Sequence, residues 1–130
     1  MAPSVLPGLM QTTWRLSVPT ILDYAGRWHP EQEVVCRTPE GPISVSTYAD
    51  LHLRAQLCAL SLHTLGVREG SIVATLAWNT TRHLEAWYGI MGLGACCHTV
   101  NPRLSDKDIR FIMNDAQVSL LMYYSLQVCI

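Results

Sequence analysis

The stretch from Gly70 to Leu104, GSIVATLAWNTTRHLEAWYGIMGLGACCHTVNPRL, decides the fold of this chain. Residues 71–77 form a short apolar run rich in β-prone side chains, which predicts a buried strand. Apolar residues then recur at helical spacing, and residues 95–100 form a second apolar run before the Asn101-Pro102 break. The order strand, helix, strand predicts a right-handed crossover with two parallel strands in one sheet and the helix on one face.

The ends of this helix have recognisable signals. We expect Asn79 to be the N-cap, because its side-chain oxygen can accept a free backbone N–H. Gly92 and Gly94 are expected to end the helix, since glycine adopts the left-handed backbone found after helix ends. The helical spacing predicts a buried side made of Leu84, Trp87, Tyr88 and Met91.

The segment before this unit predicts a helix and a hairpin. Ser17 and Pro19 suit a helix start, and the apolar spacing predicts a buried side made of Val18, Ile21, Leu22, Ala25 and Trp28. Residues 34–37 and 43–46 are short β-prone runs separated by Thr-Pro-Glu-Gly-Pro, which indicates a hairpin with a loop. Residues 1–16 have no clear periodicity and are interpreted as a lead-in segment.

The longest predicted helix begins at Thr47, which forms a capping-box pattern with Asp50, and ends before Gly66. Its core-facing stripe is predicted to be Tyr48, Leu51, Ala55, Cys58, Leu62 and Leu65. Three more leucines widen that stripe until most of the helix is expected to be covered: Leu53, Leu57 and Leu60.

The last predicted helix begins at Ser105, which has capping-box spacing to Asp108, and it carries Ile109, Ile112 and Met113 on one side. Residues 117–124 are then predicted to form the last strand. The alternation of strands and helices favours an α/β fold, a partial layered αβα domain over residues 17–124 with a mainly parallel sheet.

Two segments resemble a known family. TLAWNTTRHLE (75–85) and GLGACCHTVNPRLS (92–105) are similar to the N-terminal region of AMP-forming acyl-CoA synthetases, the adenylate-forming ligases that convert a carboxylic acid to its CoA thioester. Within that family the chain most resembles fatty-acyl and 3-(methylthio)propanoyl-CoA ligases. The resemblance implies the N-terminal part of the large AMP-binding domain of a ligase that uses ATP, Mg and CoA.

The resemblance also implies what this chain lacks. The family binds ATP phosphates with a Ser/Thr/Gly-rich loop ending in Pro-Lys-Gly, and this sequence has no such loop. Lys107 is its only lysine and stands in Ser-Asp-Lys-Asp, so the adenylating lysine is implied to belong to a C-terminal domain. No catalytic or cofactor-binding residue of the family maps onto this sequence. We therefore expect the chain alone to be inactive; the alternative is a non-catalytic assembly module that pairs with itself, as a homo-oligomer, or with the rest of a split ligase.

Three residues are candidates to lie close to a ligand. Trp78 and Asn79 follow the central strand, where parallel α/β sheets usually bind ligands. Arg103 follows the next strand and could hold a carboxylate or phosphate. The simpler interpretations are capping and packing for Trp78 and Asn79, and a solvated loop residue for Arg103.

Other polar residues are weaker candidates for a functional site. Strand alternation would put Cys96 and His98 on one face and Cys97 on the other, too few converging ligands for zinc, and we expect no metal site. Positions 83 and 85 do not face each other on a helix, so we interpret Arg82, His83 and Glu85 as partly exposed polar residues.

Composition excludes several function classes. Nine basic and ten acidic residues nearly cancel, which argues against binding of nucleic acid. Five cysteines without C-x-x-C spacing, together with a poor match to a signal peptide, predict reduced thiols in the cytoplasm. The uncharged run 86–102 is interpreted as core rather than a membrane span. Residues 125–130 depart from the family as a divergent tail; a truncated or frame-shifted reading frame and an excerpt of a longer protein both remain open as explanations.

Overall fold

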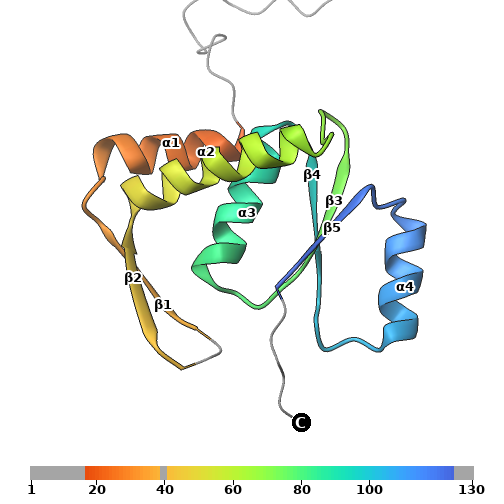
Figure 1. Ribbon diagram of the computed structural model, residues 1–130. Coiled ribbons are helices and arrows are strands. Elements are labelled where there is room, and N and C mark those ends of the chain that lie inside the picture. The colour runs from red at the N-terminus through yellow and green to blue at the C-terminus, as the bar shows by residue number, and fades with distance from the viewer. Residues whose placement is uncertain (1–16, 39–40, 125–130) are drawn as a thin grey trace, which may run out of the picture.

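The computed structural model describes residues 17–38 and 41–124, so the predicted lead-in (1–16) and divergent tail (125–130) lie outside the described residues. The order of elements confirms the predicted α/β fold (Figure 1). They are α1 Val18–Trp28, β1 Glu33–Arg37, β2 Ile43–Thr47, α2 Tyr48–Thr64, β3 Ile72–Leu76, α3 Thr81–Gly92, β4 Cys96–Val100, α4 Asp106–Asp115 and β5 Leu120–Tyr123.

The described strands form two sheets. β1 and β2 make the predicted antiparallel hairpin, and β4, β3 and β5 form a parallel sheet in that order. The chain moves from β3 to β4 through α3, then back past β3 to β5 through α4. Because both crossovers are expected to be right-handed but run in opposite directions, the helices belong on opposite faces, as Figure 1 shows. The predicted strand–helix–strand unit is confirmed.

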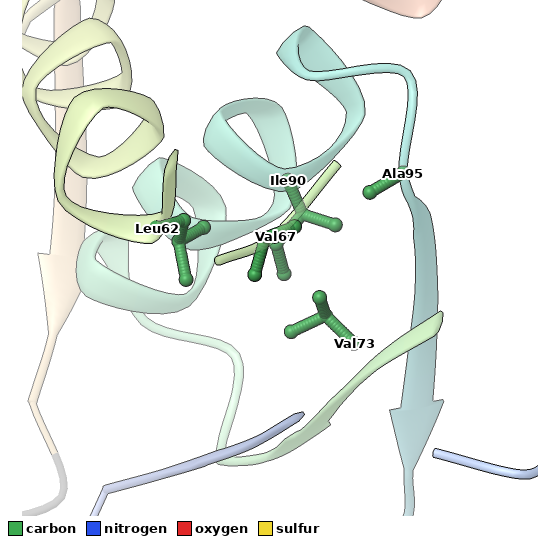
Figure 2. Packing of buried hydrophobic residues seen from close by; sticks show 5 residues of the cluster. All are labelled: Leu62, Val67, Val73, Ile90 and Ala95. Carbon is green, nitrogen blue, oxygen red and sulfur yellow. The ribbon is translucent and has the colours of Figure 1, made fainter. Parts of the chain in front are cut away.

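The main core lies between the parallel sheet and the helices α2 and α3. Val73 and Ile90 are fully buried, and they pack in a cluster with Leu62, Val67 and Ala95 (Figure 2). Cys97, Leu120 and Met122 from the neighbouring strands pack against this cluster. Val73 therefore anchors the central strand to both helices.

A second core cluster joins α1 to α2. It consists of Leu22, Leu51 and Ala55, with Leu84 and Tyr88 of α3 packed against it. α3 thus has α2 and α1 on one side and the sheet on the other. The residues predicted to be buried on α3 are only half-buried. The buried ones are Glu85, Ala86, Gly89 and Ile90.

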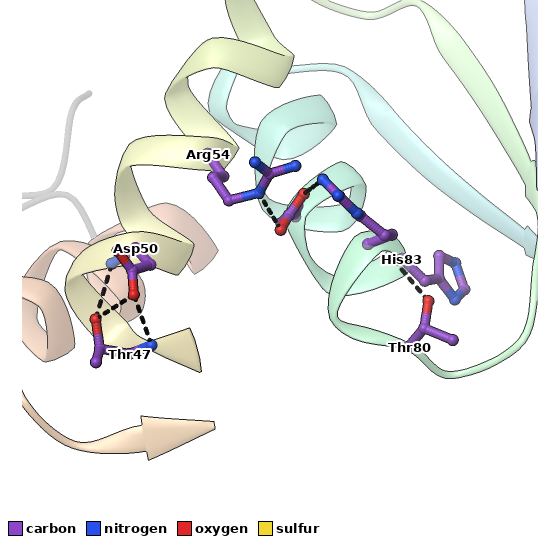
Figure 3. Close-up of polar contacts among 7 residues, drawn as sticks. Thr47, Asp50, Arg54, Thr80 and His83 are labelled. Atoms are coloured by element: carbon purple, nitrogen blue, oxygen red, sulfur yellow. Dashed lines mark hydrogen bonds and ion pairs between the residues drawn. The ribbon is translucent and has the colours of Figure 1, made fainter. Parts of the chain in front are cut away.

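Most predicted helix ends are confirmed. At the start of α2 the Asp50 N–H donates to Thr47 Oγ1 (3.1 Å) and the Thr47 N–H donates to Asp50 Oδ2 (3.0 Å), which is a capping box (Figure 3). Gly66 follows α2 with a φ of +93°, as a helix-ending glycine does. The prediction for α3 was one residue early: Thr80 is the N-cap, and its Oγ1 accepts the His83 N–H (3.3 Å). Asn79 is therefore free of the capping role.

The last helix begins as predicted, because Ser105 Oγ accepts the Asp108 N–H (3.2 Å). The predicted start of the last strand at residue 117 is wrong. Gln117 has a φ of +51°, and its N–H donates to the Asn114 carbonyl, so it belongs to the turn that closes α4. β5 consequently begins at Leu120.

Two predicted buried surfaces are exposed. On α1, Leu22 is buried as predicted, but Ile21 and Trp28 are 60% and 65% exposed. On α2, the three outer leucines are 57%, 52% and 64% exposed: Leu53, Leu57 and Leu60. The inner sides of these helices suffice to form the core described above, and no other described element covers the outer sides.

Candidate functional site

The carboxyl ends of β3 and β4 border a small cavity. After β3 the chain turns to α3 on one face of the sheet, and after β4 it turns to α4 on the other face. Two neighbouring loops that leave in opposite directions open a crevice, which is where parallel α/β sheets usually bind ligands. A cavity of about 350 Å³ lies here, lined by residues 77–79, residues 99–102 and His83.

The structure brings the three predicted ligand-proximal residues together at this crevice. Trp78 and Asn79 line the cavity, and the Arg103 guanidinium carbon lies 5.0 Å from the centre of the Trp78 ring, a cation–π distance. The Arg103 N–H donates to Asn101 Oδ1 (2.9 Å), which fixes the turn after β4. Arg103 is an exposed loop residue, as the simpler interpretation expects, and its guanidinium also lies over the Trp78 ring.

His83 is a crevice residue that the sequence interpretation missed. Its Nε2 lies 2.9 Å from Oγ1 of Thr75, a fully buried side chain on the central strand. Partial burial lowers the pKa of His83, while a hydrogen bond with the Trp78 backbone acts in the opposite direction. The imidazole is therefore neutral near pH 7. The polar Thr75 inside an apolar strand was the available signal, since a buried hydroxyl needs a partner.

Glu85 is buried, although it was predicted to be partly exposed. Its carboxylate accepts a hydrogen bond from Arg54 Nε of α2 (2.5 Å), and Arg82 Nη1 lies 3.5 Å from its other oxygen (Figure 3). As predicted, residues 83 and 85 do not face each other, since each contacts different residues. Glu85 therefore connects two helices and is not a free base for the crevice.

A larger cavity of about 750 Å³ lies between the hairpin and α3. Asn79, His83 and Thr99 line both this cavity and the crevice. Its remaining walls come from residues 34–37 of β1 and from one side of α3, including Leu84 and Trp87. The start of α3 therefore separates a polar crevice from a mostly apolar hollow.

The cysteines near the site have no shared ligand geometry. Cys96 and His98 pair with Ile72 and Ala74, while Cys97 pairs with Val73, so the predicted alternation of faces is confirmed. Within residues 17–38 and 41–124, no three His, Cys, Asp or Glu side chains are grouped so that they could hold a metal ion. Burial raises the pKa of the Cys97 thiol. Cys36, Cys58, Cys96 and Cys97 are all free thiols.

The helices of the described segment are also relevant to the membrane question. None of them combines the length and the apolar character that crossing a bilayer requires.

Comparison with known proteins identifies the family. The model of the family described as "AMP-binding enzyme" matches residues 22–129, which is most of the chain. The chain belongs to the AMP-binding enzyme family. This AMP-binding segment is 42% identical over 102 residues to a long-chain-fatty-acid–CoA ligase of Thermus thermophilus, covering 78% of this chain and 19% of that protein.

Other relatives have related names. A medium-chain-fatty-acid–CoA ligase of Ectopseudomonas oleovorans is 34% identical over 108 residues, covering 83% of this chain and 20% of that protein. A 3-methylmercaptopropionyl-CoA ligase of Ruegeria lacuscaerulensis is 33% identical over 111 residues, covering 85% and 21%. The chain therefore spans about a fifth of the length of the curated relatives it matches.

Solved structures agree with this assignment. The inhibitor-bound N-terminal domain of FACL13 from Mycobacterium tuberculosis superposes with a TM-score of 0.76 at 26% identity, covering 82% of this chain and 26% of that chain. The AMP-binding segment thus has the fold of part of an adenylate-forming ligase N-terminal domain, as the sequence resemblance implied.

Proposed function

We propose that this chain acts as the N-terminal portion of an ATP-dependent, AMP-forming carboxylic acid–CoA ligase. In the complete enzyme, a fatty acid or a related acid would react with ATP to give an acyl-adenylate, and CoA would then take the acyl group. Mg would accompany ATP. The observation that carries the proposal is the family match over residues 22–129, together with relatives that are named as CoA ligases.

In this proposal, the chain supplies framework and one wall of a substrate site. The crevice at the ends of β3 and β4 is the part of the described surface best suited to that role, because it lies at the point where neighbouring loops diverge. Trp78 and Asn79 line it, and the Arg103 guanidinium lies over the Trp78 ring at its border. These residues would contact or shape a ligand and would not carry out the reaction.

The chain by itself is proposed to be inactive. It has no Ser/Thr/Gly-rich loop that ends in Pro-Lys-Gly, and its single lysine, Lys107, lies in the exposed first turn of α4. Glu85 and His83 are both engaged with other residues, as described above. ATP binding and adenylation would therefore depend on segments that this sequence does not contain.

A second candidate function is an assembly module that joins the remaining part of a ligase. The outer face of the hairpin favours it, because three β-branched side chains are largely exposed there: Val35, Ile43 and Val45. A two-stranded sheet is only marginally stable in water, so a larger fold is the natural environment of this hairpin. The cytoplasm is the proposed location of either form, in keeping with four free thiols among the described residues.

A chimera tests the ligase proposal. The matched 102 residues of the Thermus thermophilus ligase are replaced by the corresponding residues of this chain. We expect the purified chimera to melt cooperatively and to release AMP from ATP, palmitate and CoA, whereas the present chain alone releases none. A cooperatively folded chimera without AMP release would contradict the proposal, and AMP release by the chain alone would contradict the claim that it is inactive.

In the active chimera, Trp78→Ala and Arg103→Ala test the crevice. We expect each variant to raise a KM or lower kcat by about tenfold, which corresponds to the loss of one contact of about 1.4 kcal/mol. Exposed Arg110 of α4 offers a matched control, and Arg110→Ala is expected to leave both constants unchanged. Unchanged constants in the two crevice variants would remove the crevice from the proposal.

A further inference from the structure

The turn between β3 and α3 has few backbone contacts to hold it in place. It carries Trp78 and Asn79, which line the crevice. Within residues 17–38 and 41–124, neither of them makes a hydrogen bond between backbone groups. The pairing of β3 with its neighbours ends at Leu76, and the hydrogen bonds of α3 begin at the Thr80 carbonyl. The position of this turn therefore depends on contacts made by side chains.

The His83 side chain lies between this turn and the central strand. Its Nε2 lies 2.9 Å from Oγ1 of Thr75, a side chain in the middle of the sheet that is only 1% exposed. Burial lowers the pKa of His83, and a hydrogen bond with the Trp78 backbone opposes that shift. A hydrogen bond that favours the protonated imidazole is one that the ring donates, here to the Trp78 carbonyl. The ring thus connects a fixed strand residue with the turn.

The proton positions around His83 follow from these partners. A neutral imidazole has one N–H donor and one acceptor nitrogen. Because Nε2 faces the Thr75 hydroxyl, Nδ1 is the nitrogen that donates to the Trp78 carbonyl, and Nε2 accepts the hydroxyl proton of Thr75. Burial raises the pKa of the Cys97 thiol more than its hydrogen bond with Thr75 lowers it, so the thiol stays protonated and donates to the Thr75 oxygen. Every polar group of this chain of hydrogen bonds is then satisfied.

Trp78 in turn determines where a positive charge lies. The Arg103 guanidinium carbon lies 5.0 Å from the centre of the Trp78 ring, although Arg103 itself is an exposed loop residue. We propose that His83 is a positioning residue of the crevice, which transmits the fixed position of Thr75 to the turn and so holds Trp78 and the Arg103 guanidinium where a ligand would meet them. The role in ligand binding rests on the proposed ligase function, whereas the role in holding the turn does not.

Nitrogen NMR of this chain tests the hydrogen bonds without any assay of activity. The ring signals of His83 are those that are absent from the spectrum of His83→Asn. Near neutral pH we expect Nδ1 to be protonated and Nε2 to be unprotonated, since the partner of each nitrogen fixes the tautomer. A ring protonated at Nε2 alone would overturn the inference, because Nδ1 could then not donate to the Trp78 carbonyl.

Two variants separate the N–H donor from the bulk of the ring. His83→Asn retains an amide N–H near the position of Nδ1, whereas His83→Leu fills a similar volume without a donor. The indole N–H signal of Trp78, assigned by its absence in Trp78→Phe, should keep its chemical shift in His83→Asn and move toward that of an unfolded chain in His83→Leu. Unchanged far-UV circular dichroism would show that both variants fold. A wild-type Trp78 signal in His83→Leu would overturn the inference.

A double-mutant cycle in the active chimera tests whether His83 acts through Trp78. His83→Leu and Trp78→Ala should each lower kcat/KM about tenfold, and the double variant should also lose about tenfold, because the two substitutions remove the same contact. His83→Asn should stay within about threefold of the unsubstituted chimera, since it keeps the donor. A loss of about a hundredfold in the double variant would show that the two residues act independently, and would overturn the inference.

His63 of α2 offers a matched control, because its side chain is exposed and lines neither of the two cavities that His83 lines. His63→Leu should leave both the Trp78 signal and kcat/KM unchanged. A chimera that releases no AMP would count against the ligase proposal, and the NMR measurements on this chain would still decide the role of His83 in the turn. An active chimera whose kcat/KM is unchanged by His83→Leu would overturn the inference and leave the ligase proposal intact.

Discussion

The helices α2 and α4 begin in the same way and are packed very differently. Thr47 with Asp50 and Ser105 with Asp108 place a hydroxyl and a carboxylate at the same spacing, and each hydroxyl accepts the N–H of its aspartate. α2 then buries three residues in the two cores, while no residue of α4 is fully buried. The local start signal is shared, but the tertiary contacts are not.

This difference shows what a helix cap can and cannot determine. The cap satisfies backbone N–H groups at the first turn, so it fixes where the helix begins. The stability of the helix in the protein comes mainly from burial of its apolar face, which depends on other elements. We infer that the inner side of α2 is fully packed against other elements of this chain. The apolar side of α4 is only partly covered and is suited to contact with a larger fold.

The largest expected effect separates the two helices by burial. Leu51 on α2 is 1% exposed, and Leu51→Ala should reduce the free energy of unfolding by about 3 kcal/mol through lost burial and a cavity. Ile112 on α4 is only half-buried, and Ile112→Ala should cost about 1 kcal/mol. Urea denaturation measures both values; equal losses would mean that the two helices are equally well packed.

A pair of glycines tests how closely α3 approaches α2. A Cβ at Gly89 would lie 3.0 Å from the Ala55 carbonyl oxygen, so Gly89→Ala should destabilise the fold by about 1–3 kcal/mol. A Cβ at Gly92 would meet no atom within 4 Å, so Gly92→Ala should stabilise the fold by about 0.5 kcal/mol. Thermal melting should therefore shift in opposite directions, and a stabilising Gly89→Ala would show that the helices are farther apart than described.

The two N-cap hydroxyls are expected to contribute equally to the free energy of unfolding, although the helices that they cap are packed differently. Thr47→Ala and Ser105→Ala should each cost about 1 kcal/mol, a typical value for loss of an N-cap hydroxyl. Urea midpoints of the two variants would measure these costs. A much smaller loss at Ser105 would indicate that α4 frays in the wild type.

A pH dependence distinguishes the two caps. Hydrogen bonds from Thr47 lower the pKa of Asp50 below its ordinary value of 3.8. The ionised carboxylate therefore stabilises the fold fully above pH 3.8, and this contribution disappears as the pH falls through the lower folded pKa. Acid titration of stability should lose the larger part of this component in Thr47→Ala, because the hydroxyl lowers the pKa of Asp50 more than the Thr47 backbone N–H does, and should retain all of it in Ser105→Ala. An unchanged profile in Thr47→Ala would contradict the assigned cause.

The central unit could be predicted from the sequence because its signals are local. The two apolar runs, the helical spacing between them and the glycines after the helix specified β3, α3 and β4 within one or two residues. Parallel pairing then followed from the short crossover, and it placed Trp78 and Arg103 at the same edge of the sheet. The sequence could place these two residues near each other, but it could not predict that the Arg103 guanidinium lies 5.0 Å from the centre of the Trp78 ring.

The features that the sequence did not predict depend on contacts between elements that lie far apart in the chain. The spacing of residues along the sequence does not reveal such contacts. The apolar pattern of α1 and α2 gave the apolar positions but not the number of neighbours, so Ile21 and Leu57 were wrongly expected to be covered. Asn79 and Thr80 are both good caps, and the structure uses the second. The burial of Glu85 depends on Arg54, which is 31 positions away on another helix.

Native-state hydrogen exchange of this chain is the most direct test of the contrast between the well-packed core elements and the partly covered α4 and hairpin. The account predicts that amides of α3 and β3 exchange only through global unfolding, while amides of α4 and the hairpin exchange through local openings of much lower free energy. Uniform protection, with α4 and the hairpin exchanging as slowly as α3, would contradict it.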